Sequence, residues 1–220
     1  SKGLAEELKV IEDVKTTCTT RGYKTVQNSL GQKKTIKSLE KPGHILTSTE
    51  YEGIYSCSRC GKEIKDISYL DIMLVSNKTE YTGKQRPQRV MIPGLTQGID
   101  YDVHYFDNIE VGDARVAIAG KGDYIGTVTK TYVIYRKMST LAAVLESNKY
   151  EYDGKEKTPK VTIEGLEENK DYTVSYSNNV NAGTATATIK GIAPYYEGTI
   201  IKTFEIGSKD ISNKEIKLSY

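Results

Sequence analysis

Apolar and polar residues alternate on a two-residue period in short runs between positions 89 and 206. Alternation of this kind places successive side chains on opposite faces of a strand, so it predicts half-buried β-strands. Turn residues such as Gly94, Asn108 and Gly112 separate the runs. The predicted strands are residues 89–93, 101–105, 114–119 and 129–135, then 160–163, 172–176, 185–189 and 201–206. Short strands with regular turns indicate a mainly β protein, and a β-sandwich in particular.

The chain before residue 66 has a less regular pattern. Leu4, Leu8, Ile11 and Val14 lie at near-helical spacing, whereas residues 9–14 (KVIEDV) also fit a strand, and both interpretations stay open. Residues 16–65 are rich in Thr, Ser, Gly and Lys and poor in aliphatic side chains. A segment with so little apolar surface needs a cross-link to hold its fold.

The alternating part of the chain consists of two similar halves. Residues 77–83 (NKTEYTG) recur as residues 148–154 (NKYEYDG), an offset of 71 (148 − 77). The match continues through DYDVHY at 100–105 and DYTVSY at 171–176, and, after one inserted residue, through YIGT at 124–127 and YEGT at 196–199. Such a period indicates tandem copies of one small domain, with about seven strands each.

This period divides the chain into four segments. We expect a small module at residues 1–65, copy 1 at 66–137, copy 2 at 138–208, and the start of a third copy at 209–220. The linkers at 135–140 and 207–210 are short, so we expect little bending between neighbouring modules.

Composition and charge exclude several classes of function. The net charge is only +2 over 220 residues, without the basic density of a nucleic-acid-binding protein, and no apolar run is long enough to cross a membrane. The aromatic residues are 17 Tyr and 2 Phe with no Trp, a bias that suits half-buried strands. We therefore expect a monomer with neither a nucleic-acid partner nor a membrane span.

The three cysteines all precede the copies. Cys57 and Cys60 form a C-x-x-C knuckle followed by Gly61, and with Cys18 and His44 they make a Cys₃His set suited to structural zinc. Such a metal would supply the folding energy that this polar segment lacks. Two alternatives remain open: a disulfide with one thiol left free, and a redox C-x-x-C. Four protein ligands leave no open position, which disfavours a catalytic zinc.

Two resemblances follow from these motifs. Residues 148–206, and with more drift residues 77–134, resemble bacterial immunoglobulin-like (Ig-like) repeats, through Tyr-x-Gly, Gly-Leu, DYTVSYSNN, Asn-Ala-Gly-Thr and Tyr-x-Gly-Thr. Residues 18–25 (CTTRGYKT), 57–61 (CSRCG) and 43–44 (GH) resemble a degenerate zinc-ribbon-like repeat. The resemblances imply two tandem Ig-like β-sandwiches after a small Cys/His-stapled module. They also imply a surface or secreted protein of Gram-positive bacteria.

Other residues offer little chemistry. His104 has Ser175 in the matching position, and no nucleophile or orienting acid accompanies it in a recognisable pattern. Residues 120–126 (GKGDYIG) contain the glycines of a phosphate loop but lack the helix that must follow, so a hairpin loop is expected. The matched tyrosines at 81/152, 101/172 and 105/176 are expected to anchor the core and turns rather than form a ligand platform. We identify no catalytic residue.

These observations favour a non-enzymatic stalk or adhesion segment of a bacterial surface or secreted multidomain protein, located outside the cell. One alternative is a module that binds a host or cell-wall glycan or protein, which predicts exposed aromatic side chains on one face. Another is a set of accessory domains of a secreted hydrolase.

Overall fold

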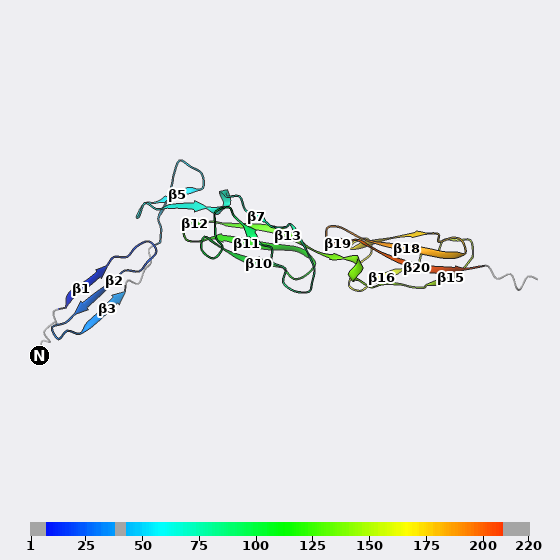
Figure 1. Cartoon of the computed structure of the whole chain (residues 1–220), viewed down its shortest axis with the longest axis horizontal. Coiled ribbons are helices and arrows are strands. Elements are labelled where there is room, and N and C mark those ends of the chain that lie inside the picture. Colours follow the sequence, from blue (N-terminus) through cyan, green and yellow to red (C-terminus); the bar gives the residue numbers. More distant parts are fainter. Residues whose placement is uncertain (1–7, 38–42, 209–220) are drawn as a thin grey trace, which may run out of the picture. The chain divides into compact units, whose positions relative to one another are not determined.

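The computed structural model describes residues 8–37 and 43–208 and is mainly β (Figure 1). Leu4 and the proposed third copy at 209–220 lie outside the described residues. Within the described part, two 3₁₀ turns accompany the strands, and no helix is long and apolar enough to span a membrane.

The residues before position 66 form two small antiparallel groups of strands. Residues 9–14, which fit both a helix and a strand, form strand β1. It pairs with β2, which pairs in turn with β3 (Figure 1). The strands are β1 (Lys9–Val14), β2 (Tyr23–Gln27), β3 (Lys33–Lys37), β4 (Leu46–Ser48), β5 (Ile54–Cys57) and β6 (Glu63–Asp66). Val26 and Ile64 are the buried aliphatic side chains of this part, so its apolar core is as small as the composition indicated.

All eight strands predicted for the copies are present. In copy 1 the elements are the 3₁₀ turn η1 (Ile67–Tyr69), β7 (Met73–Leu74), β8 (Lys78–Glu80), β9 (Val90–Met91), β10 (Tyr101–Phe106), β11 (Gly112–Gly120), β12 (Tyr124–Ile125) and β13 (Thr127–Lys137). In copy 2 they are η2 (Met138–Thr140), β14 (Ala143–Leu145), β15 (Lys149–Glu151), β16 (Val161–Ile163), β17 (Tyr172–Ser177), β18 (Gly183–Gly191), β19 (Tyr196–Glu197) and β20 (Thr199–Gly207). Each copy therefore has seven strands in matching order, and the inserted residue lies between β18 and β19.

Copy 2 has two layers around one core. A four-stranded sheet, β15-β20-β18-β17, and the antiparallel pair β14-β16 bury their inward residues in one core. Strands β15, β16, β18 and β20 of these two groups are labelled in Figure 1. Tyr172, Ile189 and Phe204 are among the fully buried side chains, and Met138 of η2 joins them. The inward residues of β18 are two alanines followed by an isoleucine (Ala185, Ala187 and Ile189), and all three are fully buried in this core.

Copy 1 repeats this pairing pattern. Strands β10, β11 and β13 follow one another as β17, β18 and β20 do, β8 pairs in parallel with β13, and β7 pairs with β9. By contact density the chain forms two compact units. One takes the described residues up to Ile72 with Ile92–Val103 and Ile118–Val128, and the other takes Met73–Met91, His104–Ala117 and the described residues from Thr129 onward.

Residues 135–140, predicted as a short linker, form regular structure. Arg136 and Lys137 are the last residues of β13, and η2 follows at once with Met138 fully buried. The segment continues as regular structure because its backbone finds hydrogen-bond partners in copy 2, at β19.

Candidate metal centre

Four separate segments supply the predicted ligands. Cys18 lies between β1 and β2, His44 precedes β4, Cys57 ends β5, and Cys60 lies in the turn between β5 and β6. The knuckle is shaped by its backbone: Gly61 donates to the carbonyl of Cys57 at 2.7 Å and has φ +72°, which favours glycine. The strands thus bring together residues that are up to 42 positions apart (60 − 18).

Two pairs of ligand atoms are spaced as a tetrahedral ion requires. All four lie within 4.8 Å of one another, with Cys18 Sγ 3.7 Å from Cys57 Sγ and Cys60 Sγ 3.6 Å from His44 Nδ1. A zinc ion about 2.3 Å from sulfur and about 2.0–2.1 Å from nitrogen needs ligand–ligand distances of about 3.5–3.8 Å. All three cysteines are free thiols, since a disulfide requires sulfur atoms about 2.05 Å apart.

The surroundings shift the pKa values of the Cys57 and Cys18 thiols in opposite directions. Burial alone would raise the pKa of Cys57, but hydrogen bonds from His44 and from the backbone of Cys60, Arg59 and Ile45 outweigh it and lower that pKa to about 5. Burial and then the neighbouring cysteines raise the pKa of Cys18 to about 11. Without a cation, one thiolate at this site opposes the ionisation of the next, whereas a divalent metal allows all three to ionise.

One buried polar atom at the site lacks a partner. His44 Nε2 is shielded from solvent and makes no hydrogen bond with any described residue. His44 Nδ1 points to the sulfur of Cys60 and so is the natural ligand atom. A Cys₃His donor set, half buried and with a ring nitrogen aimed at the sulfurs, fits zinc.

The other sequence candidates take structural roles. Residues 120–126 form a hairpin loop, with Gly120 donating to the carbonyl of Gly126 at 2.9 Å. Tyr105 and Tyr176 donate to the carbonyls of Gln88 and Pro159, which are matched positions of the two copies. Tyr101 and Tyr172 are buried. The interpretation of these tyrosines as core and turn anchors is therefore confirmed for these two pairs.

His104 is not one of the four residues of the metal cluster, and it belongs to a surface group that the sequence reasoning missed. It is exposed on β10, with its ring centroid 4.6 Å from that of Phe106, and Arg115 lies over the Phe106 ring at 5.5 Å. Arg115 also pairs with Asp107 at 2.8 Å. The signal was available, because His104 and Phe106 alternate on one strand face where copy 2 has Ser175 and Ser177.

Neither the comparison with protein-family models nor the search of curated proteins finds a match for this chain.

Proposed function

We propose that this chain is a non-enzymatic structural segment in which β-modules follow one another and a structural zinc closes the first module. The observation that carries this proposal is the cluster of Cys18, His44, Cys57 and Cys60. Four protein ligands complete a tetrahedral shell, so the ion holds chain segments together and has no free position for a substrate.

The zinc would cross-link strands that share little apolar core. Cys18 follows β1, whereas Cys57 and Cys60 belong to the β5–β6 turn, and Val26 and Ile64 are the buried aliphatic side chains nearby in sequence. In such a module metal binding is coupled to folding, because the unfolded chain does not hold the ligands in the geometry that the metal needs.

The tandem copies support the stalk part of the proposal. Two copies of one module, joined without a spacer, extend a protein by repetition rather than by forming a reaction site. On the resemblance of both copies to bacterial Ig-like repeats, we also propose that the parent protein is a surface or secreted protein of Gram-positive bacteria. We propose the sandwich assignment of the copies on the same ground.

Native and denaturing mass spectrometry of the purified chain tests the zinc directly. We expect one zinc per chain under native conditions, lost on denaturation, with three free thiols in the denatured mass. A denatured mass lighter by two hydrogens would establish a disulfide instead, and the structural-zinc proposal would be withdrawn.

A second function, ligand binding by copy 1, is supported by the exposed group around Phe106. The Phe106 side chain is 41% exposed, and His104 and Arg115 pack against it. An aromatic ring flanked by polar side chains can contact a sugar or a peptide. Copy 2 provides the matched control, because H104S/F106S installs the serines that copy 2 carries at these positions. Binding on a glycan array or to host proteins that this double variant abolishes would favour this function over the stalk.

A further inference from the structure

The boundary between the copies is crossed by a strand pair. Arg136 and Lys137 at the end of β13 pair in parallel with Tyr196 and Glu197 of β19. The backbone N–H of Arg136 donates to the carbonyl of Tyr195 at 2.8 Å. By sequence β19 belongs to copy 2, but its strand partner among the described residues is β13, so β19 extends the sheet of copy 1.

The same arrangement occurs at the preceding boundary. Lys65 and Asp66 at the end of β6 pair in parallel with Tyr124 and Ile125 of β12, and the N–H of Lys65 donates to the carbonyl of Asp123 at 2.9 Å. Here β12 of copy 1 extends the sheet β6-β5-β4 of the N-terminal module. At both boundaries, therefore, a two-residue strand of one module (β12 or β19) adds to the sheet of the module before it, although the two preceding modules differ.

A buried residue follows each strand pair. Ile67, the first residue of η1, and Met138, the first residue of η2, are 0% exposed, and they occupy matched positions 71 residues apart (138 − 67). Met138 lies in the core of copy 2. The chain therefore passes directly from a strand of one module into the interior of the next, which removes the freedom of a flexible linker.

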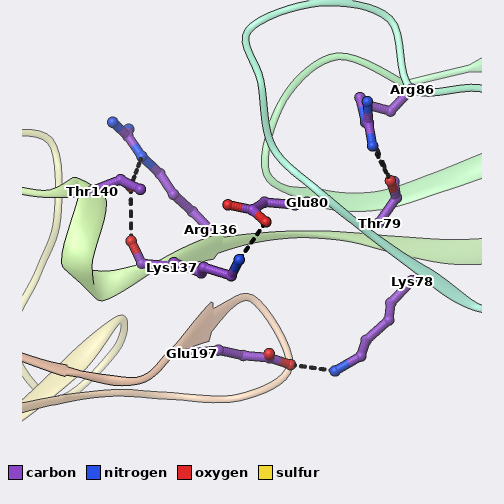
Figure 2. A network of polar contacts seen from close by, with 8 residues as sticks. All are labelled: Lys78, Thr79, Glu80, Arg86, Arg136, Lys137, Thr140 and Glu197. Carbon is purple, nitrogen blue, oxygen red and sulfur yellow. Dashed lines mark hydrogen bonds and ion pairs between the residues drawn. The ribbon is translucent and has the colours of Figure 1, made fainter.

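Charged side chains reinforce the boundary between the copies, as Figure 2 shows. Lys78 of copy 1 pairs with Glu197 of copy 2 at 2.7 Å, and this partner raises the pKa of Lys78. Lys137 pairs with Glu80 at 2.7 Å, and this ion pair holds the end of β13 at which β19 pairs. Arg136 lies over the ring of Tyr81 at 5.1 Å. At the preceding boundary Lys62 pairs with Asp123.

We infer that the two-residue strand is a coupling site through which each copy is stabilised by the folded module before it. A two-residue strand has no stability of its own, because a strand needs neighbours to satisfy its backbone groups. When the preceding module unfolds, β19 loses its strand partner and Glu197 loses Lys78. This coupling does not rest on the proposed function, because it holds whether the modules act as a stalk or bind a ligand.

Hydrogen exchange of the full chain tests the coupling with a matched pair of substitutions. Arg136→Pro removes the N–H that reaches Tyr195, whereas Arg136→Ala keeps that N–H and removes the same side chain. We expect R136P to speed the exchange of the β18 and β20 amides about 2- to 10-fold relative to R136A, the effect of one backbone hydrogen bond. Equal exchange of these amides in the two variants would overturn the inference.

R136P could unfold copy 1 itself, and faster exchange of the β11 amides would reveal this. A second experiment, in which the charges of Lys78 and Glu197 are exchanged, tests the coupling without a proline. Glu197→Lys places like charges beside Lys78, and adding Lys78→Glu restores an opposite pair across the boundary. We expect E197K to speed exchange in β18 and β20 about 2- to 5-fold, and the double variant to return it toward the original rate. Failure of the double variant to restore protection would also overturn the inference.

Discussion

Removing one ligand of the Cys/His cluster should unfold the N-terminal module and leave copy 2 intact. Cys57 is the best position, because it is 1% exposed and its sulfur lies 3.7 Å from that of Cys18. Burial of Val26 and Ile64 contributes about 3–6 kcal/mol in total, at about 1.5–3 kcal/mol each. A structural zinc contributes about 10–16 kcal/mol in small domains, so a zinc ion bound by these four residues would be the larger source of stability.

The assay is hydrogen exchange of the full chain with zinc, with a chelator, and with Cys57→Ser. We expect the β2 and β5 amides to lose their protection in the chelated protein and in the variant, while the β18 amides of copy 2 keep theirs and serve as the internal reference. Arg59→Ala is the control, because it changes an exposed residue of the same knuckle and keeps all four ligands. Unchanged protection of β2 and β5 in both chelated protein and C57S would refute the reasoning.

Three further outcomes follow from individual contacts. Tyr176→Phe in copy 2 and Tyr105→Phe in copy 1 each leave a backbone carbonyl without its donor, so urea unfolding should show similar losses of about 1–2 kcal/mol. Burial, and then the nearby Tyr105, raises the pKa of Tyr132 to about 12 from 10.0. Its contribution to stability is therefore full below pH 10 and lost as the pH rises toward 12, and in alkaline denaturation Tyr132→Phe should flatten that decline. Gly126→Ala should destabilise more than Gly198→Ala in thermal unfolding, because both have positive φ but only the first Cβ would meet a carboxylate.

Local pattern was enough to predict the strands but not their partners. The two-residue alternation located eight strands of the copies, four in each, because these strands have one buried and one exposed face. The ligand set could also be assembled from chemistry alone, since few residue types bind zinc and Cys18, His44, Cys57 and Cys60 were the candidates in one segment. The short strands β7, β8, β12, β14, β15 and β19 were not located, because two or three residues carry no clear period, and β12 and β19 in addition pair with distant segments.

The regular structure of the predicted linker residues was not foreseen for a related reason. Residues 135–140 contain Arg136, Lys137, Ser139 and Thr140, a polar composition typical of a surface connection. Their regular structure depends on the carbonyl of Tyr195, which lies 59 positions further along the chain (195 − 136). The polar composition correctly predicts that most of these side chains are exposed to solvent. It does not predict which groups form hydrogen bonds with the backbone of the segment.

The differences between the two copies separate structural from surface positions. Tyr105 and Tyr176 make the same hydrogen bond, and Lys65 and Arg136, each at the end of the strand that precedes a copy, make the same backbone contact with that copy. The outward face of β10 has instead diverged from that of β17, with His104 and Phe106 facing solvent where copy 2 has serines. Any ligand recognised through these side chains would be specific to copy 1. The outward face of β10 and β17 therefore carries no function that the two copies share, which agrees with the structural role proposed for the repeated module.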